Sequence, residues 1–304
     1  MVRRFELTDE EHARIAPLLP DLTPQRGGRW RDHRQVINGI LFRVRTGCPW
    51  RDVPDRYGPY QTLYKRFALW EQDGTWARIE AAMQADADAA GELDWRGHAD
   101  STVVRAHQHA AGARKGGSKA GDAARREALG KSRGGWTTKI HTIGEGRGRN
   151  LTSHLTPGQD ADTRQLVRLL DDVAVARPEG TGRPRKRLDS LAADKAYSSK
   201  ANRAALRRRR IPHDIPERDD QKANRVRKGP RGGRPPTFRP DRYKQRNQVE
   251  RLMNRRKQYR AVATRYDKLG DRYRATVQIA DIIIWLRAKP DRPRTPQSDP
   301  GDTP

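Results

Sequence analysis

The chain has 304 residues, of which 64 are Lys or Arg and 38 are Asp or Glu, so its formal net charge is +26. This charge is far larger than solubility requires and predicts nucleic acid as the partner. No segment reaches the roughly 20 apolar residues of a membrane span, no secretory signal precedes the first helix, and the single cysteine, Cys48, excludes a disulfide framework or a Cys-based zinc site. We therefore expect a soluble cytoplasmic, nucleoid-associated protein without a membrane partner, in which oxygen atoms hold any metal.

Residues 1 to 90 have the apolar spacing of helices. Thr8 and Glu11 form a capping box ahead of the first helix, and Asp32 begins the second. Gly47 ends that second helix. Its single apolar stripe consists of Val36, Ile37, Ile40, Leu41 and Val44.

Residues 50 to 76 predict a short helix, a turn at Gly58, and a second helix. Two interpretations stay open: a helix-turn-helix that presents its second helix to a DNA major groove, or an ordinary helical hairpin with a solvated face. In the first case Gln61 and Lys65 are candidate DNA contacts. In the second helix Leu63, Phe67 and Trp70 face inward, whereas Gln61, Lys65 and Gln72 face outward.

From residue 97 the pattern changes to strands and helices in alternation. The expected strands are residues 98–107, 136–144, 150–156 and 187–197, with a brief extended piece at 211–215, and the expected helices are 161–176 and 198–210. This order predicts an α/β fold with a mixed sheet, partly antiparallel, and helices packed on it.

Two basic segments interrupt this order. Residues 108–135 are rich in Gly, Ala, Lys and Arg, and residues 217–240 carry eight basic groups with several Pro and Gly. Both are expected to be mobile basic loops, or merely solvated linkers. Residues 288–304 contain five prolines and no apolar periodicity, which predicts a disordered tail.

Residues 241–259 predict one helix with a conspicuous polar face. At 100° per residue, Tyr243, Arg246, Glu250 and Lys257 fall in a line, whereas Leu252 and Tyr259 lie opposite and Val249 and Met253 lie toward the sides. An ordinary surface ladder of ion pairs around Glu250 would give the same spacing.

The spacing itself favours a functional interpretation. Residues 243–257 match the pattern Y-x2-R-x3-E-x6-K, which resembles the signature of the DDE transposases of bacterial insertion sequences. The segments HADSTVVRAHQHAAGARKG (98–116) and LAADKAYSSKANRAAL (191–206) resemble those around the first and second catalytic aspartates of these enzymes. Residues 28–76 are similar to the helical DNA-binding region of the insertion-sequence five family.

The resemblance implies a helical DNA-binding domain at 1–90, of helix-turn-helix type, and a ribonuclease-H-like catalytic domain at 91–287. It implies that Asp100, Asp194 and Glu250 are the catalytic residues and the metal ligands. Tyr243, Arg246 and Lys257 would position DNA phosphates, Arg as a planar fork and Lys as a point charge.

Other candidate ligands lie close to these acids. Asp94 and Asp189 are near the first two acids in the sequence, and Asp160 and Asp162 are expected to cap the helix that follows them. His98, His107 and His109 flank the first acid without completing a metal-ligand pattern, so we expect them to be structural or DNA-facing.

The chemistry follows from phosphodiester activation. Two Mg²⁺ ions, with Mn²⁺ as a substitute, can activate the attacking and leaving oxygens when carboxylates hold them. Water would cut the end of the element, and the exposed 3′ hydroxyl would attack target DNA. The expected partners are double-stranded terminal inverted repeats, target DNA, and a second copy of the chain that synapses two ends. The alternatives are a nuclease of the same fold without strand transfer, and a non-catalytic DNA-binding protein.

Overall fold

The structure is a computed structural model that describes residues 5–23, 28–112, 127–132, 134–177, 180 and 182–288. Most of the first predicted basic loop, at 113–126, and the predicted tail from 289 onward lie outside these residues. Within the described part, every helix is too short or too polar to cross a bilayer.

The N-terminal part consists of helices, and their predicted ends are confirmed. The hydroxyl of Thr8 accepts a hydrogen bond from the Glu11 N–H, and the Glu11 carboxylate accepts one from Thr8, each at 3.1 Å. The Asp32 carboxylate accepts the Gln35 N–H at 2.8 Å at the start of α2, and Gly47 ends this helix with a φ of +70°. The helices are α1 (Asp9–Ile15), α2 (His33–Thr46), α3 (Tyr60–Gln72) and α4 (Thr75–Ala89).

The hairpin around Gly58 differs from the prediction in its first half. Two single 3-10 turns, Trp50–Asp52 and Asp55–Tyr57, replace the short helix, since prolines precede both. The second half is confirmed, because the three residues predicted to face inward from α3 are buried and the three predicted to face outward are exposed.

The predicted mixed sheet is confirmed. Its strands are β1 (Arg96–Ala106), β2 (Gly130–Ser132), β3 (Gly135–Gly144), β4 (Asn150–Pro157), β5 (Ser190–Ala193), β6 (His213–Asp214) and β7 (Thr264–Arg265). The order is β2-β3-β1-β5-β6, with β4 paired to β3 and β7 paired to β1. Strands β1, β3 and β4 are antiparallel, whereas β5 and β6 continue the sheet in parallel from β1.

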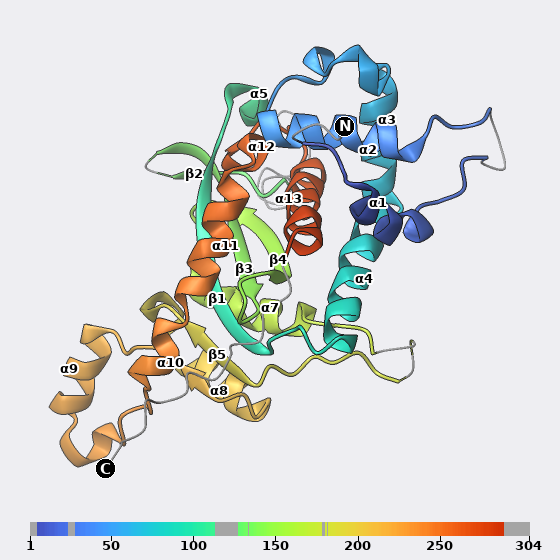
Figure 1. The fold of residues 1–304 in the computed structure, drawn as a ribbon. Helices are drawn as coiled ribbons and strands as arrows, with labels where there is room; N and C mark the ends of the chain where they lie inside the picture. Colours follow the sequence, from blue (N-terminus) through green and yellow to red (C-terminus); the bar gives the residue numbers. More distant parts are fainter. Residues whose placement is uncertain are drawn as a thin grey trace, which may run out of the picture.

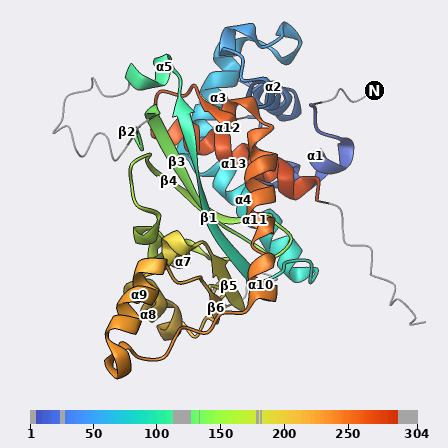
Figure 2. The same ribbon diagram turned by 90° about the vertical axis from the view of Figure 1, so that its left-hand side faces the viewer.

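The remaining helices follow β1 in the chain, and several of them pack on the sheet. They are α5 (Gln108–Ala111), α7 (Leu166–Asp172), α8 (Lys200–Arg208), α9 (Asp219–Arg227), α10 (Pro240–Lys244), α11 (Asn247–Lys257), α12 (Arg260–Ala263) and α13 (Gly270–Leu286). In Figures 1 and 2, α11 runs along β1, and α8 and α9 lie at the end of the molecule opposite α2 and α3.

The core joins the N-terminal helices to the C-terminal ones. Helix α13 packs against α2, α3, α4 and β4 (Figure 1). Most of its side chains are buried. A buried ion pair between Arg43 on α2 and Asp267, at 2.8 Å, adds a second tie. One continuous apolar cluster therefore runs through both halves of the chain.

Two predictions from the second half are wrong. The helix expected at 241–259 is interrupted by a turn at Gln245 and Arg246 and ends at Lys257, which divides it into α10 and α11. Residues 217–240 do not form a structureless loop, because they contain α9 and a 3-10 turn at Gly229–Gly232.

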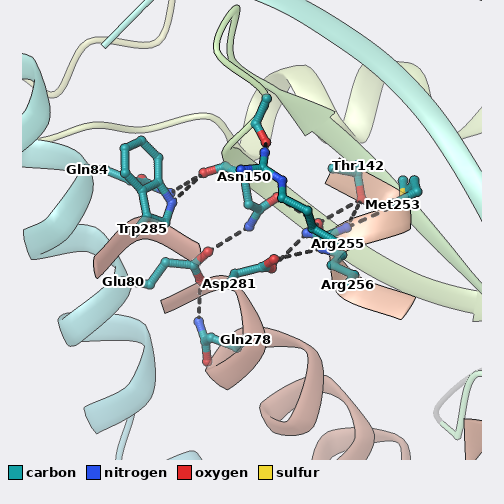
Figure 3. A network of polar contacts seen from close by, with 12 residues as sticks. Glu80, Gln84, Thr142, Asn150, Met253, Arg255, Arg256, Gln278, Asp281 and Trp285 are labelled. Carbon is teal, nitrogen blue, oxygen red and sulfur yellow. Dashed lines mark hydrogen bonds and ion pairs between the residues drawn. The ribbon is translucent and has the colours of Figure 1, made fainter. Parts of the chain in front are cut away.

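A buried polar network joins α4, β4, α11 and α13 (Figure 3). The Glu80 carboxylate accepts hydrogen bonds from Asn150 at 2.6 Å and from Gln278 at 2.8 Å. Beside it, Arg256 of α11 and Asp281 of α13 form a two-pronged ion pair with both distances at 2.7 Å. The helix that carries Glu250 is thereby fixed to the core by polar as well as apolar contacts.

The Glu80→Gln substitution should flatten the pH dependence of stability. Burial, reinforced by the charge of Asp281, raises the pKa of Glu80 from 4.5 to about 7. The folded protein keeps a proton that the unfolded chain releases, so this stabilisation is complete below pH 4.5 and is lost as the pH rises to about 7. We expect urea unfolding to show that, between pH 4.5 and pH 8, the free energy of unfolding falls by about 3 kcal/mol more in the wild type than in the variant. Asp86→Asn, at an exposed site on the same helix, should leave the decline unchanged.

Candidate active site

Two of the predicted acids lie at equivalent points of adjacent strands. Strands β1 and β5 are parallel, with Ala99 paired to Ala193. Asp100 and Asp194 each follow one of these paired residues, Asp100 within β1 and Asp194 immediately after the last residue of β5. Each carboxylate accepts the N–H of the next residue, at 2.8 Å for Asp100 and 2.6 Å for Asp194.

The third acid comes from a helix that packs across these strands. Glu250 lies in the first turn of α11, and the buried side chains of Val249, Leu252 and Met253 hold that helix against the sheet. This packing confirms the apolar face predicted from the sequence. Glu250 itself lies on the exposed side of this first turn.

One guanidinium joins the first and third acids. Arg246 donates to Asp100 at 3.0 Å through one terminal nitrogen and to Glu250 at 2.5 Å through the other. Both acids are therefore within hydrogen-bond reach of a single side chain, although 150 positions separate them in the sequence.

The charge of Asp194 acts on both Asp100 and Arg246. Burial raises the pKa of Asp100, and the charges of Glu250 and Asp194 act in the same direction, against the Ser101 N–H and Arg246. Burial opposes the charge on Arg246, yet Asp100, Tyr243, Glu250 and Asp194 together raise its pKa. Three carboxylates thus act on one cation.

The donor set suits a hard divalent cation. Carboxylate oxygens are the ligands that Mg²⁺ prefers. Among the described residues, however, no group of three or more His, Cys, Asp or Glu side chains is arranged closely enough to hold an ion. In this arrangement the Arg246 guanidinium neutralises Asp100 and Glu250. These two carboxylates would have to give up their bonds to Arg246 in order to hold a metal ion.

The neighbouring acids have separate partners. Asp94 pairs with Arg96, and Asp189 pairs with Arg185 at 2.7 Å. Asp162 is not the helix cap that we expected, because Ala161 occupies the capping position of the short 3-10 turn there.

Asp162 instead supports the strand that carries Asp100. Its carboxylate accepts the hydroxyl of Ser101 at 2.8 Å and the ammonium of Lys139 at 3.0 Å. Sequence reasoning missed Lys139, although a lysine within a buried strand was a visible signal that an acid lies opposite it.

The three histidines near the first acid lie in two different environments. His98 is buried, and neither ring nitrogen has a hydrogen-bond partner within the described part of the chain. Burial lowers its pKa to about 4, so its ring is neutral at pH 7. The rings of His107 and His109 stack with centroids 4.7 Å apart.

Of the remaining candidates, only Tyr243 lies beside the acids. Tyr243 lies at the site, with its ring 5.2 Å from Phe238 and 5.7 Å from the Arg246 guanidinium. Lys257 lies at the other end of α11, seven residues or about 10 Å from Glu250 along the helix axis. Gln61 and Lys65 are exposed on α3, among the N-terminal helices.

Comparisons with known proteins match both halves of the chain. Residues 7–80 match the family described as "Putative transposase of IS4/5 family", and residues 94–280 match the family described as "Transposase DDE domain". No solved structure matches the chain.

Three relatives cover different shares of the chain. A protein of Brucella ovis described as "Putative transposase for insertion sequence element IS6501" is 30% identical over 151 residues, which are 50% of this chain and 99% of that protein. The "Insertion element IS402 uncharacterized 16.2 kDa protein" of Burkholderia cepacia is 35% identical over 33% of this chain and 73% of its own length. The "Uncharacterized protein y4sN" of Sinorhizobium fredii is 38% identical over 36% of this chain and 83% of its own length.

Proposed function

The chain belongs to the DDE transposases of insertion sequences, and on this premise we propose that it binds the terminal inverted repeats of its element and catalyses metal-dependent strand cleavage and strand transfer. Enzymes of this family cut DNA and join it to a target. The observation that supports the proposal is that Arg246 bonds both Asp100 and Glu250, while Asp194 directly follows the strand paired to that of Asp100.

We infer that residues 91–287 form a ribonuclease-H-like domain and that residues 1–90 form the DNA-binding part. The sheet supports this inference, since three antiparallel strands continue into two parallel ones, with the first acid on the central strand. Because α13 shares its core with α2 to α4, the two parts do not pack independently.

The proposed roles follow from the side chains at the site. When bound, two divalent ions activate the attacking and leaving oxygens of a phosphodiester. Asp100, Asp194 and Glu250 would hold these ions, with Mg²⁺ as the natural ion and Mn²⁺ as a substitute. Once its carboxylate partners bind metal, the Arg246 fork is free to bind a phosphate in two-pronged fashion.

The other candidates would extend the grip on DNA. Tyr243 orients Arg246 from the side, and Lys257 provides a point charge two turns along α11. Gln61 and Lys65 would contact duplex DNA from α3. Because two ends have to be brought together, we expect the active species to be a homodimer.

A joining assay tests this function. Short inverted repeats in the DNA flanking the gene identify the terminal sequence. Pre-cut terminal fragments, mixed with the protein, Mg²⁺ and a target plasmid, should yield fragments covalently joined to the plasmid. The same mixture with EDTA should yield none. Cutting of uncut ends without joining of pre-cut ends would identify a nuclease instead, and binding without either reaction would identify a non-catalytic DNA-binding protein.

A further inference from the structure

A basic groove lies at the edge of the sheet, outside the acidic site. A cavity of about 670 Å³ opens between α8, β6 and residues 234–239, and a second of about 370 Å³ opens between α8 and α9. The two cavities share Arg203, Arg207, Arg234 and Pro236, so they are parts of one surface. We call this surface the arginine groove, lined by Arg203, Arg207, Arg210, Arg234 and Arg239.

The groove has a large excess of positive charge. No acidic side chain is among the described residues that line the larger cavity. Glu217 lines the smaller one, but it is paired with Arg225. Arg239 is partly neutralised by buried Asp214 at 3.2 Å. The exposed Arg207 and Arg234 have no ion-pair partner within the described residues.

A buried arginine with an unused donor lies at the centre of the groove. Arg203 is only 7% exposed and donates through one terminal nitrogen to Ser198 at 3.1 Å and to the Ile215 carbonyl at 2.8 Å. Its other terminal nitrogen is buried without a partner among the described residues. A buried guanidinium donor left unpaired costs free energy, which an anion bound in the groove would recover.

The lining favours a phosphate backbone over stacked bases. Among the described residues that line the two cavities, none is Phe, Tyr or Trp, whereas proteins that bind single strands stack bases on such rings. Five arginines that line one channel offer positive charge to several phosphates of a backbone at once, whereas a single small anion would need fewer.

The groove is linked to the acidic site. Phe238, next to Arg239, packs its ring 5.2 Å from that of Tyr243, which in turn lies against Arg246. Helix α10, which leads into α11, also packs on β5 and β6. The groove and the acidic site are therefore joined through neighbouring residues.

We propose that the arginine groove binds the sugar-phosphate backbone of double-stranded DNA at a position several nucleotides from the reacting phosphate. This proposal rests on the proposed function, since it assigns part of the substrate to a surface outside the catalytic acids. The groove supplies affinity that is independent of base sequence.

The double variant Arg207→Gln/Arg234→Gln tests the groove against a matched control. Both arginines are exposed, so their loss should not affect folding. Arg208→Gln/Arg231→Gln removes the same charge from positions of α8 and the neighbouring 3-10 turn that do not line either cavity. The affinity of each full-length protein for a duplex carrying the terminal repeat, and for a random duplex, is measured by fluorescence anisotropy between about 50 and 200 mM salt.

The groove variant should bind both duplexes more weakly, and its plot of log Kd against log salt should be less steep by about 2, one for each lost phosphate contact. The control should keep a slope close to that of the wild type.

Three results would overturn the proposal. Equal slopes for the groove and control variants would show that the groove does not contact DNA, even if the wild type cuts and joins. Inorganic pyrophosphate is titrated into the same proteins as a small-anion probe. If the groove variant bound pyrophosphate more weakly than the wild type but bound both duplexes equally well, the groove would be a small-anion site. Absence of DNA binding by the wild type would remove the proposed function together with the groove.

Discussion

The Glu250→Gln variant should lose cleavage of terminal-repeat DNA by more than about 10³-fold, which corresponds to about 4 kcal/mol of transition-state stabilisation. The amide keeps the shape of the side chain but removes the charge that would hold a divalent ion. DNA binding should not fall, since the substitution makes the basic helix more positive. The measurement is the single-turnover rate of end cleavage in Mg²⁺, alongside the Kd for the same duplex.

The structure provides a fold control for this experiment. Arg246 retains its bond to Asp100 when Glu250 is replaced, so the thermal unfolding temperature should change little. Asp86→Asn, at an exposed site on α4, should leave the cleavage rate unchanged. Cleavage by the Glu250→Gln variant at a rate close to wild type would remove this residue from the catalytic set.

Replacing Arg256 by Met should lower the free energy of unfolding by about 3 to 5 kcal/mol. Arg256 and Asp281 are each 1% exposed and bind each other through two hydrogen bonds. Arg256 also donates to the hydroxyls of Thr142 and Ser153. Methionine fills a similar volume but leaves Asp281 as an unpaired acid in the core. Urea unfolding measures the loss.

Two further variants test whether the loss comes from the unpaired buried charge or from removing any arginine of this helix. Arg251→Met, on the exposed face of the same helix, should cost less than about 0.5 kcal/mol. The double variant Arg256→Met/Asp281→Leu should recover much of the loss, because it removes both charges together. If Arg256→Met cost less than about 1 kcal/mol, the ion pair would not be what fixes α11.

Local signals predicted the parts of the fold that depend on neighbouring residues. The capping residues Thr8 and Asp32 and the helix end at Gly47 were confirmed because these contacts span only a few positions. Period-two alternation located β1, β3 and β4, and the order of elements predicted a mixed sheet. The two-residue strand β7 and the three-residue β2 were missed, since segments so short show no alternation.

Long-range partners explain the errors. The structural role of Arg256 could not be predicted, because only the fold reveals Asp281 opposite it. Asp162 fitted a capping pattern, yet Ser101 and Lys139 come from strands distant in sequence. The turn at Gln245 has no Gly or Pro to mark it, so 100° spacing alone predicted a continuous helix.

For the site, a spacing pattern predicted more than composition did. It selected Tyr243, Arg246 and Glu250, which the structure places together with Asp100. Their catalytic roles stay predictions. The direct bond between Arg246 and the acids could not be predicted, since spacing does not distinguish a phosphate ligand from an internal counter-ion.

The shared core of α13 with α2, α3 and α4 has a consequence during synthesis. On the ribosome, the first helices emerge long before residues 270–286 and must wait with an uncovered apolar face. The same late helix carries Asp281, the partner of Arg256, so α11 cannot be seated until then either. The core that seats α11 is therefore complete only once residue 286 has been made, and a chain that ends before α13 leaves both the apolar face of α2 to α4 and the Arg256 guanidinium without their partners.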